Sequence, residues 1–258
     1  MEHLELSIEG RIATVTLNRP DKRNALNALL VKELTDVFRD LSKPGACKAI
    51  VLTGSGEAFC AGADLAALRE MQEADMAKNL EDSEQLAALF MAMHEFPGVI
   101  FGAVNGHALA GGCGLVTMCD IVLTHDRAKF GYTEARIGFV PAIVAKFLLE
   151  KVGRSQAYRL LLGAEIVGAD TAREIGLVHE VASFDTYQER LEWWRGHLAH
   201  GLSSEALAST KKLIRLVSGM DLATATQYAA RMNAAARMSG DCKKGIAAFL
   251  NKESMRWS

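Results

Sequence analysis

Apolar residues in the first half of the chain alternate between strand-like and helix-like spacing. Leu4–Ile8 and Ile12–Leu17 alternate with a period of two around Glu9-Gly10-Arg11, which predicts a hairpin. From Leu26 to Leu41 the apolar side chains recur every three or four residues, which predicts a helix. Further short apolar runs are typical of buried strands: Ala49–Leu52, Val99–Val104 and Ile121–Thr124.

Between these strands the pattern predicts helices and two loops rich in small residues. Leu65–Met71 and Leu86–Phe96 have helical spacing, and Leu115–Cys119 looks helical as well. Residues 73–84 are charged, and we expect them to be mobile or to lie on the surface. Because strands alternate with helices, the fold class should be α/β with much parallel pairing.

The last third of the chain has a different character, because nearly everything from Pro141 to Leu250 has helical spacing. Glycines 153, 163, 176 and 201 stand between several of these segments, where helices end. A mostly helical region with Met and Ala stripes often packs against another subunit. The predicted helices are Ile143–Glu150, Ser155–Leu162, Ala169–Ile175, Tyr187–His200, Glu205–Val217, Leu222–Arg237 and Cys242–Leu250.

Composition narrows the classes of function. The 258 residues are 50% hydrophobic and 23% charged, with a formal net charge of -2, so nothing favours broad binding to nucleic acid. Five cysteines without a CxxC pair favour reduced thiols over a disulfide framework. We see no targeting pattern at the N-terminus and no apolar stretch long enough to span a membrane, so we expect a cytoplasmic protein. No histidine or cysteine spacing indicates a metal site.

Two Gly/Ala-rich loops, each after a buried strand, are the candidate site for ligand binding and catalysis. The first is FCAGADL at 59–65, and the second is NGHALAGGCG at 105–114. Small residues let a ligand approach the backbone, and the second loop leads into a helix whose first N–H groups are unpaired. Two such N–H groups would stabilise an oxygen that becomes negative. The glycines of one loop alone would be explained as well by tight turns, and the spacing fits neither a dinucleotide fingerprint nor a P-loop.

Four motifs in order then resemble one known family. LNRPDKRNALN, AFCAGADL, NGHALAGGCGL with a following CD, and KFGYTEARIGFVPA are similar to the crotonase (enoyl-CoA hydratase/isomerase) superfamily, and the resemblance continues to AFLNK near the end. It implies a β-β-α spiral core in residues 1–195, which holds the active site, and a helical trimerisation region in residues 196–258. The implied substrate is an acyl-CoA, with no separate cofactor. The implied assembly is a trimer or a dimer of trimers.

The resemblance also assigns roles to individual residues. The N–H groups of Ala63 and Gly111 would hold the thioester oxygen. Phe249 and Lys252 match positions that reach the coenzyme A of a neighbouring subunit in similar proteins. The expected coenzyme A cleft is lined by Lys22, Arg23, Ala25, Ala61, Asp64 and Leu65.

Glu134 is the predicted acid/base, and its expected partner is missing. Family hydratases commonly use two glutamates, but here the position of the first is occupied by Gly114. Two carboxylates orient one water together, whereas a single one must shuttle the proton alone or serve double-bond isomerisation. A half-buried glutamate would have the raised pKa that this shuttling requires. Tyr132 could orient water or substrate, although packing is the more common role for such a residue.

The stretch FGYTEARIGFVPAIV, with GGCGL before it, resembles hydratases of branched, carboxylate-bearing acyl-CoAs of the methylglutaconyl-CoA type. Such a substrate needs a cation, for which Arg69, Lys78 and Arg136 are candidates. Lys211, Lys212 and Arg215 are expected to form a solvated helix face. Two other functions stay open: an enoyl-CoA isomerase that uses Glu134 alone, and a non-catalytic crotonase-like protein that binds RNA or a partner.

Overall fold

The computed structural model describes residues 1–257. Their strands form two sheets, and from β3 to β8 the chain passes back and forth between them. The larger sheet has six strands in the order β1-β2-β3-β5-β7-β10, with β1 and β2 antiparallel and the other pairs parallel. Its strands are β1 Leu4–Glu9, β2 Ile12–Leu17, β3 Ala49–Gly54, β5 Val99–Val104, β7 Ile121–His125 and β10 Glu180–Ala182. The predicted hairpin and the three predicted buried strands are therefore confirmed.

The smaller sheet consists of four three-residue strands in the order β4-β6-β8-β9. They are β4 Ala58–Cys60, β6 His107–Leu109, β8 Lys129–Gly131 and β9 Ile166–Gly168. The first two lie inside the segments that we expected to be loops, and β9 and β10 interrupt a region that we expected to be helical. Such short strands carry too little alternation to be recognised in the sequence.

The order of elements confirms the α/β class and shows a repeating β-β-α unit. Each unit places one strand in the large sheet, one in the small sheet, and then a helix: β3, β4 and α2–α3; β5, β6 and α4; β7, β8 and α5. The strands of the small sheet therefore succeed one another along one edge, and the segment after each strand comes to the same side of the molecule. That side carries the candidate site.

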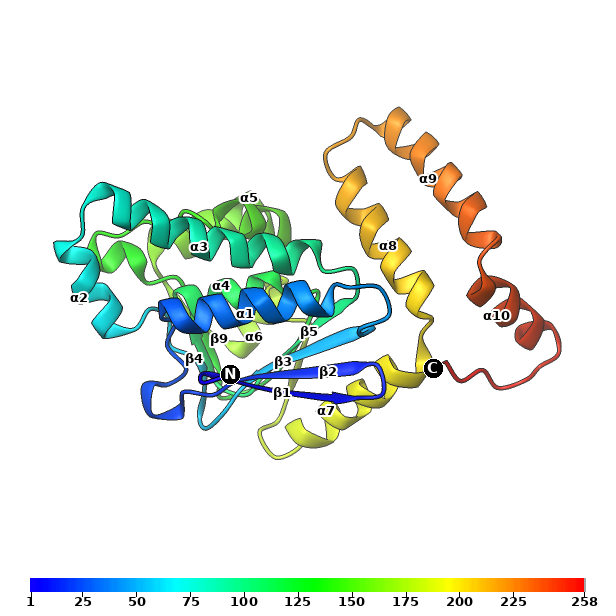
Figure 1. The fold of residues 1–258 in the computed structure, drawn as a ribbon, viewed down its shortest axis with the longest axis horizontal. Helices are drawn as coiled ribbons and strands as arrows, with labels where there is room; N and C mark the ends of the chain where they lie inside the picture. The colour runs from blue at the N-terminus through cyan, green and yellow to red at the C-terminus, as the bar shows by residue number, and fades with distance from the viewer. Residues whose placement is uncertain (258) are drawn as a thin grey trace.

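Helices cover both faces of the large sheet, so its central strands are buried throughout. On one face, Ile50 and Leu52 of β3 share a core with α1 and α3, which lie side by side (Figure 1). On the other face, Val51 belongs to a second core with Tyr187 and Leu191 of α7. This double burial explains the continuous apolar runs of β3 and β5, which show no alternation.

The helices of the core region begin at side-chain caps close to the predicted starts. Asn27 caps α1 (Ala28–Leu41), and Asp64 caps α2 (Leu65–Glu73). Asp75 caps α3, which runs unbroken over Met76–Glu95. The charged residues 73–84 do lie on the surface, but most of them are helical. The prediction that they are mobile or lie on the surface is therefore confirmed for the surface, and an N-cap with tertiary packing at the far end stabilises one long helix there.

The remaining helices follow the predicted order with shifted bounds. The α-helices are α4 Gly111–Met118, α5 Ala145–Gly163, α6 Ala169–Glu174, α7 Tyr187–Gly196, α8 Ser204–Val217, α9 Leu222–Arg237 and α10 Gly240–Leu250. Two predicted helices, which Gly153 separates, form the single kinked α5. Short helical turns are η1 Pro20–Lys22, η2 Glu134–Ile137 and the π-helical turn His197–Gly201. The predicted boundary at residue 196 falls at that last turn.

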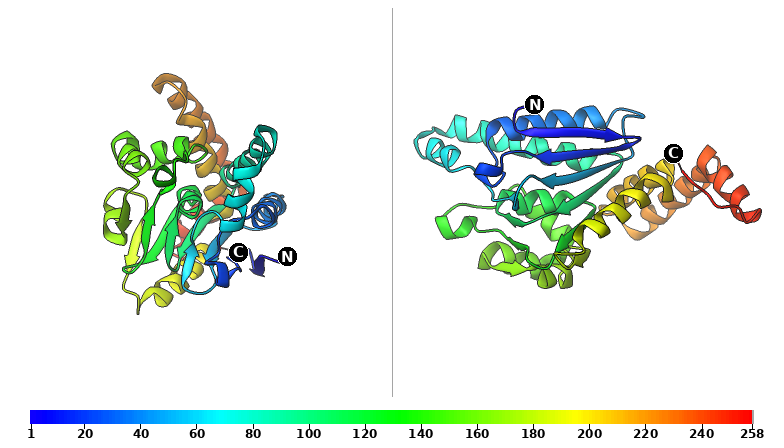
Figure 2. Two further views of the ribbon diagram at one scale, coloured as in Figure 1. Left: turned by 90° about the vertical axis from the view of Figure 1, so that its left-hand side faces the viewer. Right: turned by 90° about the horizontal axis from the view of Figure 1, so that it is seen from below.

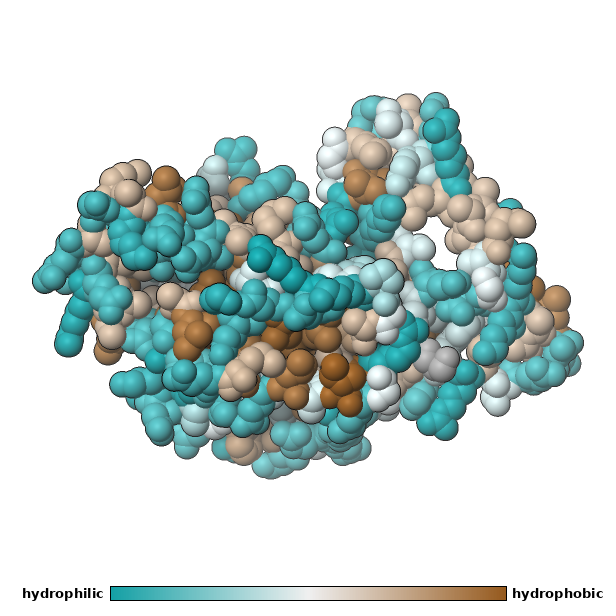
Figure 3. Space-filling model, viewed as in Figure 1, coloured by the Kyte–Doolittle hydropathy of each residue, from teal (hydrophilic) through white to brown (hydrophobic). Residues whose placement is uncertain are grey.

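Helices α8 to α10 form an arm that projects from the body (Figures 1 and 2). Helices α8 and α9 contain no buried residue, and α10 contains only Ala248. Large apolar side chains on the arm are exposed, among them Leu222 (83%) and Phe249 (82%). Figure 3 shows apolar atoms at the outer end of α10 and over the β1–β2 hairpin, on a surface that is otherwise largely hydrophilic.

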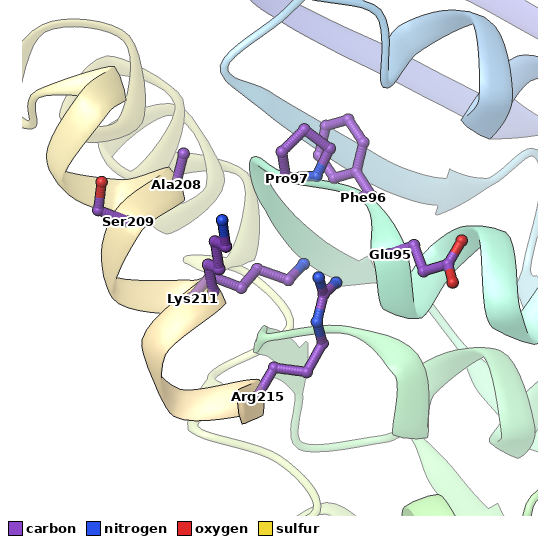
Figure 4. Close-up of a pocket in the computed structure, with 8 residues that line it drawn as sticks. Glu95, Phe96, Pro97, Ala208, Ser209, Lys211 and Arg215 are labelled. Carbon is purple, nitrogen blue, oxygen red and sulfur yellow. The ribbon is translucent and has the colours of Figure 1, made fainter. Parts of the chain in front are cut away.

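Basic side chains attach the arm to the body, together with Leu207 of α8, which packs against the second core. Lys211 Nζ lies 2.7 Å from Asp120 Oδ2 and donates to the Gly98 carbonyl, and Arg215 donates to the His94 carbonyl. Both cross a hollow of about 200 Å³ between the end of α3 and α8 (Figure 4). The expectation that these residues form a solvated helix face was wrong for Lys211 and Arg215, because backbone carbonyls at the end of α3 receive them.

Within residues 1–257, no helix is long and apolar enough to cross a membrane. The same residues contain no group of three or more His, Cys, Asp or Glu side chains placed to hold a metal ion.

Candidate active site

The two Gly/Ala-rich loops lie side by side because the strands before them are paired. Strands β4 and β6 run parallel, with Ala58 opposite His107 and Cys60 opposite Ala108. Parallel strands end at the same edge of a sheet, so residues 61–64 and 110–112 emerge together. Two glycines allow the close approach: a Cβ at Gly62 would lie 2.9 Å from the Ala110 Cβ, and one at Gly112 would lie 2.2 Å from the Cys60 carbonyl oxygen.

The N–H groups of Ala63 and Gly111 are both left available within this junction. Leu26 pairs with Ala63 like a neighbouring strand residue: its N–H donates to the Gly62 carbonyl, and its carbonyl accepts from the Asp64 N–H. Neither hydrogen bond uses the Ala63 N–H. Gly111 is the first residue of α4, whose first helical hydrogen bond is donated by Gly114. Within residues 1–257 neither N–H donates a hydrogen bond. Leu26 touches both sites, since a Cβ at Gly111 would meet its Cδ1 at 2.9 Å.

Ala110 holds the start of α4 in an uncommon backbone conformation. Its φ is 48° and its ψ is -123°, which a residue with a Cβ adopts only when its surroundings impose it. The Ala110 N–H donates to the Gly131 carbonyl at 2.7 Å. That bond turns the chain so that the first N–H groups of α4 face the end of β4, and such strain is common at functional sites.

Glu134 reaches the same edge from the third parallel strand of the small sheet. Strand β8 pairs with β6, with Leu109 opposite Gly131, and Glu134 begins the short helix η2 just beyond. The Glu134 Oε2 atom is buried without a hydrogen-bond partner among the described residues. Burial raises the pKa of Glu134 above its ordinary value, and a hydrogen bond from its own backbone acts against that shift. A raised pKa makes this carboxyl a stronger proton acceptor than an exposed glutamate.

Tyr132 fastens the Glu134 segment to α4. The ring is fully buried, and its hydroxyl contacts Thr117 Oγ1 and donates to the Cys113 carbonyl at 3.2 Å. A side chain so enclosed packs against the helix and holds the start of the Glu134 segment in place. Burial raises the pKa of Tyr132 well above its ordinary value, so the hydroxyl stays protonated.

The space beside Gly114 is filled by a ring from a distant helix. A Cβ at Gly114 would lie 2.8 Å from Phe90 Cζ. Phe90 belongs to α3, is 2% exposed, and packs edge-on against Phe147 with ring centroids 6.1 Å apart. An apolar wall therefore stands where a second acidic side chain would extend. Phe90 could not be predicted from the sequence, because its contact joins residues 24 positions apart and no motif contains both.

The residues expected to line a coenzyme A cleft surround the first loop. Lys22 and Arg23 are exposed at and just after η1, Ala25 is buried, and the Ala61 N–H donates to the Arg23 carbonyl at 3.0 Å. Leu65 is 74% exposed. This group therefore lies together at the end of β4, as two neighbouring segments of the chain.

Asp64 is occupied by structural partners. It caps α2 by accepting from Ala66 N–H and forms a 2.8 Å ion pair with Arg19. Burial opposes its charge, but these two hydrogen bonds hold the pKa of Asp64 below its ordinary value. Neighbouring Asn24 is fully buried and donates to the carbonyls of Ser55 and Ala58. Sequence reasoning missed Arg19 and Asn24, although both lie inside the first motif.

Phe249 and Lys252 lie far from this group within the same chain. Phe249 is near the end of α10 and Lys252 follows it, and Figure 1 places α10 at the opposite end of the molecule from α2. The folded chain alone does not bring them to the loops.

The three candidate cations for a distal carboxylate differ in their partners. Arg136 donates two hydrogen bonds to the Ala164 carbonyl, and Lys78 pairs with Glu81. Arg69 lies exposed on α2, in the second turn after the Ala63 loop, and has no ion pair within residues 1–257. Arg69 and Arg136 both lack an ion pair among the described residues, and of the two Arg69 has no hydrogen-bond partner for its side chain.

A model of the family described as enoyl-CoA hydratase/isomerase matches residues 7–258. The chain belongs to this family. Its activity is of the enoyl-CoA hydratase/isomerase type, and the hydratases among its relatives are lyases.

Relatives of this family member match it along nearly their whole length. A protein of Thermus thermophilus, provisionally named an enoyl-CoA hydratase, is 38% identical over 96% of this chain and 98% of its own. The 2,3-dehydroadipyl-CoA hydratase of Escherichia coli is 32% identical over 98% of both chains. A crystal structure of an enoyl-CoA hydratase from Mycobacterium smegmatis superposes with a TM-score of 0.91 at 30% identity, covering 99% of this chain and 98% of that one.

Proposed function

We propose that this chain adds water to a 2-enoyl-CoA, or removes it from a 3-hydroxyacyl-CoA, with Glu134 as the only acid/base. The observation that carries the proposal is the meeting, at one edge of the small sheet, of two available N–H groups and a carboxyl with a raised pKa. Within residues 1–257 no second carboxylate stands at Gly114, where Phe90 fills the space.

In the hydration direction, the ionised Glu134 takes a proton from water as the water oxygen bonds to the β-carbon of the substrate. The electron pair of the double bond moves to the thioester, and the charge collects on its oxygen. The N–H groups of Ala63 and Gly111 stabilise that oxygen, and removal of one such donor typically costs about a hundred- to a thousandfold in rate. Protonated Glu134 then gives its proton to the α-carbon, which restores the carboxylate. No resident cofactor takes part.

The acyl group that we propose is branched and ends in a carboxylate, of the 3-methylglutaconyl-CoA and 3-hydroxy-3-methylglutaryl-CoA type. The segment around Glu134 supports this proposal, because it resembles hydratases of branched, carboxylate-bearing acyl-CoAs. The E. coli relative supports it too, because its name specifies a dicarboxylic acyl-CoA. Arg69 would receive the distal carboxylate, since its charge is uncompensated and its helix starts at the oxyanion loop.

A second candidate is double-bond isomerisation, which the apolar wall at Phe90 favours. One base that removes a proton and returns it two carbons along needs no bound water, and the ring beside Gly114 leaves less room for one. Mass spectrometry separates the two reactions, because hydration adds the mass of one water and isomerisation does not. A panel of linear and carboxylate-bearing 2-enoyl-CoAs without any mass gain would rule out the hydratase.

Glu134→Gln tests the assignment of the proton carrier. We expect turnover to fall by about 10²–10⁴-fold, because the amide keeps the shape but cannot exchange the proton. Glu165→Gln is the control, since that carboxylate is exposed and paired with Arg159. Near wild-type turnover in Glu134→Gln would show that another group moves the proton, and no turnover of any enoyl-CoA by the wild type would favour a non-catalytic binding role.

We further propose that the active enzyme is a trimer or a pair of trimers. The exposed apolar side chains of α9 and α10 support self-association, and a neighbouring copy would bring Phe249 and Lys252 to the coenzyme A of the next subunit. The cytoplasmic location stays a prediction from composition and cysteine content.

A further inference from the structure

A lysine on α5 meets the carboxyl-terminal end of the helix whose first N–H is that of Gly111. Lys151 Nζ donates to the Thr117 carbonyl at 3.3 Å and to the Cys119 carbonyl at 2.5 Å. These carbonyls belong to the last turn of α4 and to its C-cap residue, and they have no acceptor role inside the helix. Lys151 therefore binds the negative end of the α4 dipole from the protein interior.

The charge of Lys151 is not neutralised by direct contact with a carboxylate. Within residues 1–257 it forms no ion pair. The nearest candidate, Asp120, lies at the same helix end but contacts Lys211 Nζ at 2.7 Å and accepts from the Ile100 N–H. Burial lowers the pKa of Lys151, while Cys119 and Asp120 oppose that shift. A cation at a part-buried site with two carbonyl partners but no carboxylate in contact is costly to keep, which suggests that it serves the helix it touches.

The cation and the oxyanion lie at opposite ends of one short helix. Helix α4 has eight residues, so its ends are about 12 Å apart at about 1.5 Å per residue. All of its residues after Gly111 are buried, so solvent does not screen the path between the ends. At an effective dielectric constant of about 20, one unit charge at about 12–15 Å changes the stability of an anion enough to alter a rate roughly five- to tenfold.

We propose that Lys151 is a positioning residue for the oxyanion hole: it fixes the far end of α4, so that the Gly111 N–H stays aimed, and it adds positive potential along the helix to the developing enolate. The inference rests on the proposed function, because it requires negative charge to form on a thioester oxygen held by the Gly111 N–H. Lys151 would stabilise the transition state more than the bound substrate, whose thioester oxygen carries little charge. Lys151 thus affects kcat more than KM.

Three variants separate charge from shape. Lys151→Met removes the charge and both hydrogen bonds, and we expect kcat to fall five- to twentyfold with KM changed less than twofold. Lys151→Gln keeps a donor without the charge and should fall roughly five- to tenfold. Lys151→Arg restores the charge and should return kcat to within about twofold. Lys146→Met is the control, because that lysine lies exposed on the same helix and pairs with Glu150.

A spectroscopic readout keeps the test independent of turnover. The CoA thioester of 4-(dimethylamino)cinnamic acid absorbs at longer wavelength when its carbonyl is polarised, so its red shift on binding reports the oxyanion hole directly. We expect a smaller shift in Lys151→Met and Lys151→Gln, and a wild-type shift in Lys151→Arg and Lys146→Met. If Lys151→Met does not fold, the Gln and Arg variants decide.

An unchanged red shift and kcat in Lys151→Gln would overturn the proposal, as would a loss that Lys151→Arg fails to restore, which indicates a merely structural lysine. The proposed function fails differently. Full turnover in Glu134→Gln would sink the proton-carrier assignment while leaving the dependence of the red shift on Lys151 intact.

Discussion

Glu134 links catalysis to pH through its unpartnered carboxyl oxygen. The carboxylate must be ionised to take a proton from water, and burial raises its pKa. We therefore expect the acid limb of kcat/KM against pH, which reports the free enzyme, to lie above the ordinary glutamate pKa of 4.5. A profile that stays flat down to that value would contradict the assignment.

The same shift predicts the stability of Glu134→Gln. A carboxyl whose folded pKa is raised costs stability when ionised, and the cost vanishes at a pH below its unfolded value. Glu134→Gln should therefore raise the melting temperature at pH 7 to 8. The gain should shrink to nothing as the pH falls below about 4.5. Scanning calorimetry of both proteins across that range checks the sign, and a loss of stability at neutral pH would show that Glu134 has a stabilising partner.

Gly114 and Phe90 form a contact that can be tested by substitution. Gly114→Ala places a methyl group 2.8 Å from the Phe90 ring, and overpacking of this kind costs about 1–3 kcal/mol of unfolding free energy. In a Phe90→Leu background the same substitution should cost at least about 1 kcal/mol less. Equal costs in both backgrounds, measured by urea unfolding, would mean that the ring moves aside freely.

At the residue scale, the sequence located what motifs carry and missed what packing decides. Ala63, Gly111 and Glu134 were predicted as site residues from local motifs, and the pairing of β4, β6 and β8 brings their segments to one edge. Phe90 and Lys151 were not identified, because their importance depends on contacts with α4 that are distant in sequence. Lys151 in particular has no motif, and only its burial against two carbonyls marks it.

At the scale of elements, Asp64 couples the oxyanion loop to helix α2. Asp64→Ala removes both the N-cap and the ion pair with Arg19, and we expect a loss of about 2–4 kcal/mol of unfolding free energy together with weaker binding of coenzyme A. Asp64→Asn keeps the cap and should lose about 1 kcal/mol less. Chemical denaturation of the two variants compares them, and equal losses would show that the cap contributes nothing.

Long elements were predictable, and short ones were not. Helical spacing of apolar residues located α1, and continuous apolar runs located β3 and β5, because each of these elements buries several residues. Strands β4, β6 and β8 have three residues each, and only their mutual pairing, which joins residues about 50 and 20 positions apart, makes them strands. These unrecognised strands align the two loops and Glu134, so the geometry of the site was the part that sequence periodicity could not supply.

At the scale of the whole molecule, the arm predicts an assembly. We expect light scattering to give the mass of three or six chains. A Phe249→Asp, Leu250→Asp double variant should shift that mass toward one chain, because both side chains are exposed in the single copy and an interface would bury them. Met76→Asp is the control, since Met76 is 79% exposed at the start of α3, where an acidic residue is favourable. A single-chain mass for the wild type would contradict the proposed trimer.

The ring of Phe90 against Gly114 also constrains how this enzyme can evolve. Shortening the side chain at position 90 is one first step toward a second carboxylate at position 114, because a Cβ there would lie 2.8 Å from the Phe90 ring. That first step leaves a void in the core and lowers stability before any catalytic benefit appears. The reverse order produces a steric clash. Both orders therefore pass through a less stable intermediate sequence, and this favours keeping glycine at position 114.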